Sequence, residues 1–440
     1  MPRKGLLIFL LVIFAAAMGI SRAFSEENRS KEMRTLEKIV QEVQENYVTE
    51  VEPQKLFDGA YRGVLQTLDP YSQFLDKRET TTFTADTEGR FGGLGIEISV
   101  REGLLTVVAP IRGTPAYEAG VLPGDVILKI NGKSTERITV EDAVRQLRGE
   151  IGTKVVLTVR HVGSPTDTEI AITRVVIHPS AVEWEMIDAA AGIALMRVSS
   201  FTATVMETMA EGVRKLQEQH LKALILDLRQ NPGGLLEKSA EMADLFLPDG
   251  VIVSVKGRRP EMAKVFRAHK GGPLESTLVV VVIDEYSASA SEILAAALHD
   301  HKRALLIGAP TYGKGSVQNV IPLGDGEALK LTTARYYTPN DKPIEDHHGI
   351  MPDIYAPMSR EQMLALRRQE QEDKLRNHYH LGGAIEEDEQ AAPPAPKPGG
   401  PEGTEPNEPP ARRTRVVDFQ LKAALNILRW QLNGMGHSAK

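Results

Sequence analysis

The spacing of hydrophobic positions distinguishes the start of the chain from its remaining parts. In "EMRTLEKIVQEVQENY", which begins at Glu32, hydrophobic residues recur every three or four positions, which predicts an amphipathic helix. Pro70 interrupts this pattern within "LDPYSQFLDKRE". We therefore expect a helical N-terminal region over residues 26–85.

The next stretch has the pattern of a small β-rich domain. Short β-rich runs such as "GGLGIEISV" and "KVVLTVRHV" surround a single helical pattern, "TVEDAVRQLRG". We expect a separate domain over residues 86–173.

From Trp184 onward, buried-strand patterns alternate with helical ones. The strand patterns include "GIALMRVSSF", "LKALILDLRQNPGG", "STLVVVVID" and "RALLIGAP", and helical patterns such as "TMAEGVRKLQEQH" and "SASASEILAAALHD" lie between them. This alternation predicts an α/β core with a mainly parallel sheet and flanking helices, whose sites lie at the carboxyl ends of strands. We assign the core to residues 174–370.

The C-terminal part divides into a linker and a helix. Residues 386–411 are acidic and rich in Pro and Gly, which predicts a disordered linker. Residues 412–434 place four leucines on one helical face: Leu421, Leu425, Leu428 and Leu432. This helix is expected either to dock on the core of its own chain or to join two chains.

The N-terminal sequence predicts that most of the chain is located outside the cytoplasm. Arg3 and Lys4 precede an apolar run from about Leu6 to Ile20, so residues 1–25 form either a signal peptide or an uncleaved membrane anchor. The rest of the chain would then be periplasmic, or anchored to the outer face of the inner membrane.

Composition excludes several classes of site. The 440 residues are 42% hydrophobic, enough for two or three domains with cores. A net charge of −7 without a basic cluster argues against nucleic-acid binding. The absence of cysteine excludes disulfides, cysteine nucleophiles and zinc-thiolate sites, and no H-E-x-x-H motif is present. We expect neither a metal nor a cofactor.

Three serines at two-residue spacing raise the question of a nucleophile. Ser287, Ser289 and Ser291 follow a buried-strand pattern and open a helical one. Ser289 and Glu292 have the S-x-x-E spacing of a capping box, so a purely structural role is the first interpretation.

A nucleophilic serine needs a base, and the chain offers histidines and one unusual lysine. There is no G-x-S-x-G motif, and His299 and His301 fall at the end of the helix that follows the serines. His347 and His348 are the best remaining histidines. Lys314 lies between two glycines that allow a tight turn, and it could act as a base when neutral, or be an ordinary exposed turn lysine.

The β-rich segment resembles a PDZ domain. The resemblance lies in "FGGLGIEI" and "TPAYEAGVLPGDVILKINGK", followed by the single helix. A glycine-rich turn entering a strand points backbone N–H groups into one concavity, which suits a carboxylate. The resemblance implies that protein C-termini bind there, with Gly93, Leu94, Gly95 and Ile96 as the carboxylate loop.

The whole chain resembles the C-terminal processing peptidases, or tail-specific proteases. The motifs "LDLRQNPGG", "SASASE" and "GAPTYGKGSVQ" follow a PDZ-like segment in this order, and the resemblance covers about residues 35–360. It implies a crotonase-like core, with Ser289 as nucleophile, Lys314 as general base and Gln318 orienting the lysine amine. Ser287 and Ser291 would be structural, with Ser291 as the helix N-cap.

The same resemblance implies further roles. Backbone N–H groups at Ala290 and at Gly233 or Gly234 would stabilise the oxyanion. Arg148, at the end of the PDZ-like helix, would gate the response to a docked peptide.

The expected function is therefore that of a serine endopeptidase with a Ser-Lys(-Gln) site. Its PDZ-like domain would capture apolar C-terminal tails of loosely folded extracytoplasmic proteins, with a possible adaptor protein and a homodimer or higher homo-oligomer. Two alternatives stay open: a catalytically silent PDZ scaffold, and a hydrolase that uses Ser289 with His347 or His348.

Overall fold

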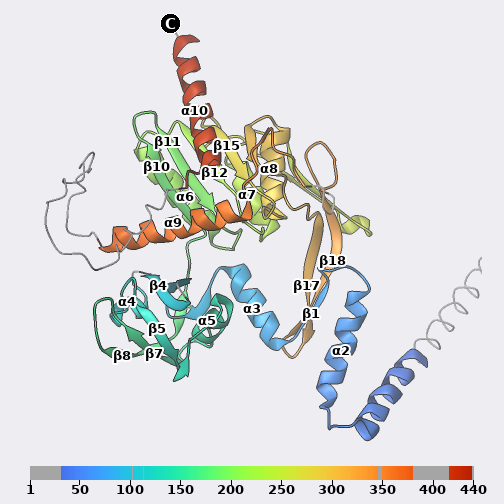
Figure 1. Cartoon of the computed structure of the whole chain (residues 1–440). Helices are drawn as coiled ribbons and strands as arrows, with labels where there is room; N and C mark the ends of the chain where they lie inside the picture. Colours follow the sequence, from blue (N-terminus) through green and yellow to red (C-terminus); the bar gives the residue numbers. More distant parts are fainter. Residues whose placement is uncertain (1–30, 102, 112, 345–348, 380–415, 439–440) are drawn as a thin grey trace, which may run out of the picture. The chain divides into compact units, whose positions relative to one another are not determined.

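The computed structural model describes residues 31–101, 103–111, 113–344, 349–379 and 416–438 (Figure 1). The predicted signal or anchor, the predicted linker and the histidine pair 347–348 lie outside these residues. Within the described part, no helix is long and apolar enough to span a membrane. The chain forms two compact units, and Gln318–Thr332 belongs to the unit that contains the residues up to Thr80.

The smaller unit combines N-terminal helices with a strand pairing. Residues 31–46 are helical and lead to α2 (Pro53–Gln66), which has proline in its first turn. β1 (Gln73–Leu75) pairs antiparallel with β18 (Glu327–Tyr337), which also pairs with β17 (Ser316–Gly324). The sequence pattern indicated the helices but missed β1, because three residues are too few to show a period.

The second unit contains the PDZ-like domain, which α3 (Lys77–Glu88) precedes. Its sheet has the order β3-β4-β5-β7-β8, β6 pairs with β5, and β2 pairs with β9. The strands and helices are β2 (Phe91–Gly93), β3 (Ile96–Arg101), β4 (Leu104–Pro110), α4 (Pro115–Glu118), β5 (Val126–Ile130), β6 (Lys133–Ser134), α5 (Val140–Leu147), β7 (Lys154–Arg160), β8 (Asp167–Thr173) and β9 (Val175–Ile177). Leu105, Val107 and Leu157 lie in its own hydrophobic core.

The core domain is built on a mixed sheet of order β10-β11-β12-β15-β16-β19. Its strands are β10 (Val182–Asp188), β11 (Ile193–Val198), β12 (Ala223–Asp227), β15 (Leu278–Ile283), β16 (Ala304–Gly308) and β19 (Ile354–Tyr355). The strands from β11 to β19 are parallel, whereas β10 and β11 are antiparallel. The expectation of a mainly parallel core therefore holds only in part, because the short link between β10 and β11 cannot make the crossover that parallel pairing needs.

A second, antiparallel sheet adds to the mixed character of the core. β13 (Val251–Gly257) pairs with β14 (Lys264–Arg267) and with the end of β18, and η1 (Pro260–Met262) joins β13 to β14. α9 (Arg360–Tyr379) follows β19.

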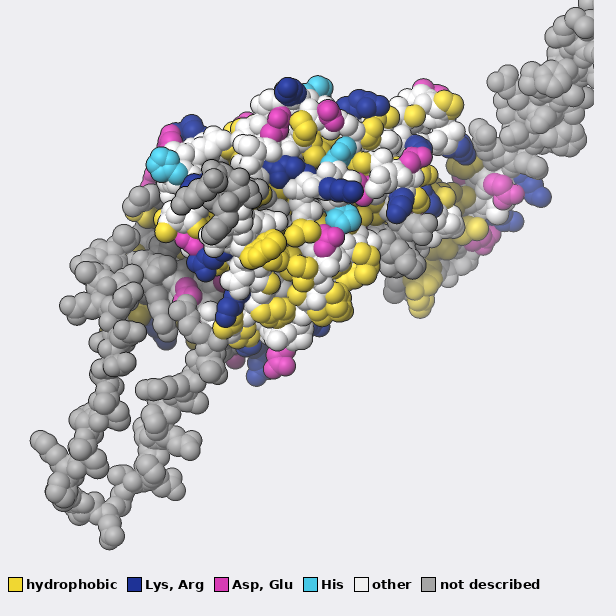
Figure 2. All heavy atoms as spheres, turned by 90° about the horizontal axis from the view of Figure 1, so that it is seen from above, with side chains coloured by type: hydrophobic (Ala, Val, Ile, Leu, Met, Phe, Trp, Pro, Cys, Tyr) yellow, Lys and Arg dark blue, Asp and Glu magenta, His cyan; other side chains and the backbone are white. Residues whose placement is uncertain are grey.

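The face seen in Figure 2 carries basic and acidic side chains interspersed with hydrophobic ones.

Helices cover both faces of the core sheet. Side chains such as Met196 and Val281 pack with α6 (Val205–Glu218), α7 (Leu236–Asp244) and α8 (Ala290–Asp300) on one face. The alternate residues, among them Val280 and Val282, pack with α10 (Phe419–Ser438) on the other (Figure 1). Of the two expectations for the C-terminal helix, docking on the core of its own chain is confirmed.

Candidate functional site

Ser289 lies at the turn between β15 and α8, in an unusual backbone conformation. Its φ is 55° and its ψ is −112°, and its surface is 7% exposed. Non-glycine residues rarely adopt positive φ, and such strain persists only where the surroundings impose it. At its start, this turn is held by Asp284, whose carboxylate accepts hydrogen bonds from the backbone N–H groups of Tyr286 (3.1 Å) and Ser287 (3.0 Å).

The two neighbouring serines are structural. The Ser287 hydroxyl donates to the carbonyl of Leu228 at 2.8 Å, and the Ser291 hydroxyl donates to the carbonyl of Asn231 at 2.9 Å. The expectation that Ser291 caps the helix is wrong: Ser289 occupies the N-cap position, and Ser291 already lies within α8. The S-x-x-E spacing had indicated this cap correctly.

Glu292 connects the Ser289 turn to the Lys314 loop. Its fully buried carboxylate accepts hydrogen bonds from the N–H of Ser289 at 2.7 Å and the N–H of Lys314 at 2.8 Å. The other carboxylate oxygen accepts from the Thr311 hydroxyl and the Gly313 N–H, both at 2.6 Å. Sequence reasoning predicted the cap and missed the bridge, because the partners of Glu292 in the loop are about twenty residues away.

The Lys314 loop is as tight as its glycines predict. A β-carbon on Gly315 would lie 1.6 Å from the carbonyl oxygen of Ile344, so only glycine fits there. The Gly315 carbonyl accepts a hydrogen bond from the N–H of Tyr336 at 2.8 Å. Lys314 itself is partly buried.

Tyr336 is a neighbour of Ser289 that the sequence did not reveal. Its side chain makes a hydrogen bond to Ser289. Burial raises the pKa of the Tyr336 hydroxyl to about 12, against the smaller opposing effect of that hydrogen bond. The phenol is therefore neutral at physiological pH. It lies near the end of β18 with no motif around it, so no sequence signal marked it.

The "NPGG" loop after β12 packs directly against the Ser289 turn. A β-carbon on Gly233 would lie 2.9 Å from both the Ser289 β-carbon and the Ala290 backbone nitrogen. Gly233 has a φ of 105°, and its N–H donates to the side-chain oxygen of Asn231 at 2.9 Å. Gly234 packs instead against the backbone of Phe201. Of the two glycine candidates, the structure thus brings Gly233 to Ser289.

Gln318 belongs to the smaller unit, where it joins a polar chain. Its amide nitrogen donates to the Thr332 hydroxyl at 3.3 Å, and that hydroxyl donates to Asp69 at 3.2 Å. Burial raises the pKa of Asp69, but hydrogen bonds from Ser72, Tyr71 and Thr332 outweigh it and leave the pKa below its ordinary value. The Asp69 carboxylate in the "LDPYS" turn is therefore ionised, and it accepts a hydrogen bond from Thr332 of β18.

The predicted carboxylate loop lines one groove of the PDZ-like domain. Gly93, Leu94, Gly95 and Ile96 border a cavity of about 190 Å³, together with hydrophobic side chains of α5. Gly95 has a φ of 79°, and a β-carbon there would lie 2.2 Å from the Thr114 hydroxyl oxygen, so the loop requires glycine at this position.

Arg148 lies at the rim of this groove. Its guanidinium is 3.8 Å from the centre of the Phe91 ring and 3.0 Å from the Asp86 carboxylate of α3. Arg148 therefore links the groove to α3, the helix that precedes the domain.

His299 and His301 make their contacts outside this arrangement. The imidazole of His299 is 3.1 Å from the Asp353 carboxylate, and that of His301 contacts the carbonyl of Val251 at 2.7 Å. Both lie at the far end of α8, as predicted.

Comparison with known proteins places the chain in a family. Residues 192–356 match the model of peptidase family S41, residues 106–161 a PDZ domain, and residues 15–80 the N-terminal domain of the activating protease CtpB. A carboxy-terminal-processing protease of Bartonella bacilliformis is 40% identical over 363 residues, which cover 80% of this chain and 82% of that protein. The carboxy-terminal processing protease CtpA of Bacillus subtilis is 33% identical over 368 residues, 81% of this chain and 78% of that protein.

Among solved structures, the photosystem II D1 C-terminal processing protease is similar, with 26% identity and a TM-score of 0.45 over 72% of this chain and 86% of that one. The motifs around Ser289 and Lys314 and the PDZ-like segment had indicated the same family. The chain belongs to peptidase family S41 and is a serine-type C-terminal processing protease with a PDZ domain.

Proposed function

We propose that Ser289 is the nucleophile, Lys314 the general base and Gln318 the residue that orients the lysine amine. The observation that carries this proposal is the Glu292 carboxylate, which ties the N–H of Ser289 to the N–H of Lys314. Two loops that are distant in sequence are thereby fixed to one buried group. A strained serine at the start of a buried helix suits a nucleophile, because its hydroxyl is held in one position.

The reaction is an acyl transfer in two steps. Neutral Lys314 takes the Ser289 proton as the serine oxygen bonds to the peptide carbonyl carbon. The tetrahedral intermediate then breaks its C–N bond, and the lysine ammonium returns the proton to the leaving amine. Water, activated by the same lysine, adds to the acyl-enzyme and releases the new C-terminus.

The oxyanion is stabilised by backbone N–H groups at the start of α8. The Ala290 N–H is the first candidate, because the helix dipole favours negative charge there. Gly233 is the second, since its close approach to Ser289 supports the role. Its N–H must first leave the Asn231 side chain.

The PDZ groove captures the substrate's C-terminal tail as an added strand. A mostly hydrophobic lining favours an apolar last residue, and the loop of Gly93 to Ile96 holds the carboxylate. The substrates are loosely folded extracytoplasmic proteins, and the N-terminal apolar run directs or anchors the chain there. The same proposal includes an adaptor protein, a homodimer or higher homo-oligomer, and a crotonase-like fold of the core.

A covalent probe and two substrates test this function. Purified protein is treated with a serine-reactive fluorophosphonate, and the modified residue is located by mass spectrometry. The adduct is expected on Ser289. Burying one leucine-sized side chain contributes roughly 1.5–3 kcal/mol. Hence, in a parallel assay, an unstructured substrate with an apolar tail should be cleaved at least roughly tenfold faster than one with a charged tail.

The same experiment separates the alternatives. Binding of the apolar tail without an adduct or cleavage would favour the silent scaffold. Equal rates of cleavage for both substrates would exclude capture of the tail by the PDZ groove, but not the peptidase activity.

Arg148→Ala is expected to weaken the dependence of cleavage on the tail. The substitution removes the Phe91 and Asp86 contacts that link the groove to α3. Each contact contributes about 0.5–1 kcal/mol, so the ratio of apolar-tail to charged-tail cleavage should fall about fivefold to thirtyfold. Arg145→Ala is the matched control, because Arg145 forms an exposed ion pair with Asp142 on the same helix. An unchanged ratio in Arg148→Ala would exclude the gating role.

A further inference from the structure

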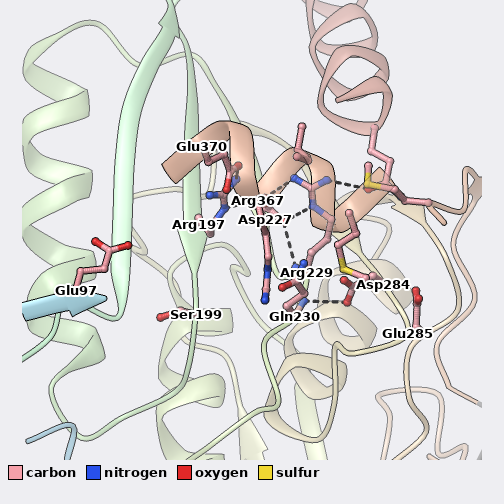
Figure 3. A pocket seen from close by; sticks show the side chains of 14 residues that line it. Glu97, Arg197, Ser199, Asp227, Arg229, Gln230, Asp284, Glu285, Arg367 and Glu370 are labelled. Carbon is pink, nitrogen blue, oxygen red and sulfur yellow. Dashed lines mark hydrogen bonds and ion pairs between the residues drawn. The ribbon is translucent and has the colours of Figure 1, made fainter. Parts of the chain in front are cut away.

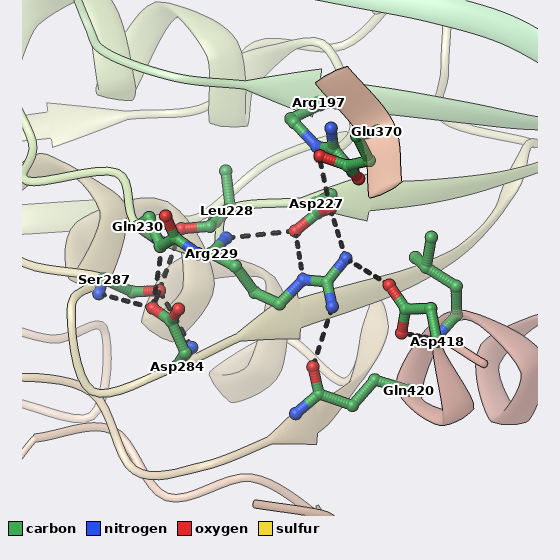
Figure 4. A network of polar contacts seen from close by, with 11 residues as sticks. Arg197, Asp227, Leu228, Arg229, Gln230, Asp284, Ser287, Glu370, Asp418 and Gln420 are labelled. Atoms are coloured by element: carbon green, nitrogen blue, oxygen red, sulfur yellow. Dashed lines mark hydrogen bonds and ion pairs between the residues drawn. The ribbon is translucent and has the colours of Figure 1, made fainter. Parts of the chain in front are cut away.

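Asp227, at the end of β12, is the centre of a buried ion-pair network. Its carboxylate is 1% exposed and accepts two hydrogen bonds from the Arg229 guanidinium, at 2.9 Å and 2.8 Å. Arg197 on β11 adds a third at 3.1 Å (Figure 4). Burial raises the pKa of Asp227, but the charge of Arg229 outweighs it, and the carboxyl stays ionised. The bidentate geometry fixes the guanidinium plane.

The remaining partners of Arg229 are Asp418, just before α10, and Gln420, in the first turn of α10. Asp418 Oδ2 is 2.9 Å from one guanidinium nitrogen, and Gln420 Oε1 accepts from the other terminal nitrogen at 2.9 Å. Within the described residues, that oxygen of Asp418 is buried and has no further hydrogen-bond partner. The other oxygen of Asp418 accepts from the Leu421 N–H, and the Gln420 amide donates to the Ala356 carbonyl at 2.6 Å. Both side chains are thus held in place by the docked helix.

The Arg229 side chain is largely buried, with 10% of its surface exposed. A cavity of about 390 Å³ borders the network, and Figure 3 shows Arg229 and Arg197 beside it. The cavity is lined by charged side chains and by hydrophobic ones such as Met363 and Leu366. The polar contacts to Asp227, Asp418 and Gln420 hold the guanidinium in its position.

Arg229 is also the second residue of the loop that leads from β12 to Ser289. The next residue, Gln230, donates its N–H to Asp284 at 2.9 Å, at the start of the Ser289 turn. Asn231 then accepts a hydrogen bond from the Ala288 N–H at 3.0 Å and holds the Gly233 N–H. Only three residues lie between Arg229 and Gly233, the glycine that packs on Ser289.

We propose that Asp418 and Gln420 are positioning residues of catalysis, through which docked α10 holds Arg229 and thereby the loop that brings Gly233 to Ser289. The inference rests on the proposed function of Ser289 and its oxyanion donors. It gives the C-terminal helix a part in turnover beyond covering the sheet.

The test compares two full-length variants that each remove contacts of α10. Asp418→Ala/Gln420→Ala removes the contacts to Arg229. Arg429→Ala removes the ion pair to Asp188 elsewhere on the same helix, at 2.7 Å, and is the control for a general loss of docking. Cleavage of a fluorogenic peptide gives kcat and KM, and hydrogen exchange over residues 228–236 reports on the loop.

We expect the double variant to lower kcat about tenfold to a hundredfold, with KM changed less than about twofold. Loss of one oxyanion donor lowers kcat about 10²–10³-fold, and loosening its loop should do less. Exchange over residues 228–236 should rise in the double variant and stay unchanged in Arg429→Ala. Asp418→Glu, with Gln420 retained, should recover most of kcat.

Two readouts keep the outcomes separate. An unchanged kcat and unchanged exchange in the double variant, or equal losses in Arg429→Ala, would overturn the positioning role. If wild-type cleavage did not depend on Ser289, the proposed function would fail. The exchange data would then still decide whether α10 holds the loop.

Discussion

Ser289→Ala and Lys314→Ala are each expected to lower the rate of peptide cleavage at least about a thousandfold. The first removes the oxygen that forms the acyl-enzyme, and the second removes the base that accepts its proton. Residues that act as one unit give strongly non-additive effects, so the double variant should be scarcely slower than either single one. The measurement is kcat/KM on an unstructured peptide with an apolar tail.

Tail binding is the internal control for both variants. The PDZ groove consists of other residues, so its affinity for the tail, measured by calorimetry, should not change. Activity that survives in Lys314→Ala but not in Ser289→Ala would transfer the base role to a histidine such as His347 or His348. Activity that survives in both would end the proposal.

Glu292→Gln is expected to have the second largest effect, on both activity and stability. The carboxylate accepts four hydrogen bonds while fully buried, two of them from the N–H groups of Ser289 and Lys314. An amide places an NH₂ group against at least one of these donors. Hydrogen bonds to a charged group contribute roughly 1.5–3 kcal/mol each. The free energy of unfolding of the core should therefore fall by about 2–4 kcal/mol.

Activity should fall further than stability alone explains. At temperatures where the variant is still folded, acylation by the fluorophosphonate should be slowed about a hundredfold or more, because both loops lose their common anchor. Glu285→Gln is the matched control, since Glu285 is an exposed residue of the same turn. Acylation at the wild-type rate in folded Glu292→Gln would show that the bridge does not position the two loops.

Local patterns predicted more of the fold than of the site. Runs such as "STLVVVVID" and "SASASEILAAALHD" correctly predicted β15 and α8, because a buried strand and a helical period can both be recognised from neighbouring residues. The antiparallel direction of β10 was not predicted, because strand direction depends on the connections between strands. The strand β1 was missed, because three residues are too few to show a period.

Within the site, the sequence indicated residues that belong to motifs and missed those recruited by the fold. Ser289, Lys314 and Gly233 stand in recognisable stretches, whereas Tyr336 meets Ser289 only through the path of β18. Arg229 and Asp418 are separated by nearly half the length of the chain, so no local sequence pattern could have predicted their ion pair.

The bond between the Gly233 N–H and the Asn231 side chain implies a threshold for substrates. In this conformation the Gly233 N–H donates to the Asn231 side chain. If Gly233 is the oxyanion donor proposed above, an incoming carbonyl must compete with that oxygen for the same proton. An intramolecular hydrogen bond of this kind contributes about 1 kcal/mol net, a handicap of roughly fivefold. A protein segment that stays near Ser289 only briefly would often dissociate before its carbonyl displaces the Asn231 oxygen. A tail retained by the PDZ groove could return repeatedly until it wins, so discrimination against passing proteins would come from residence time rather than from the cleaved sequence.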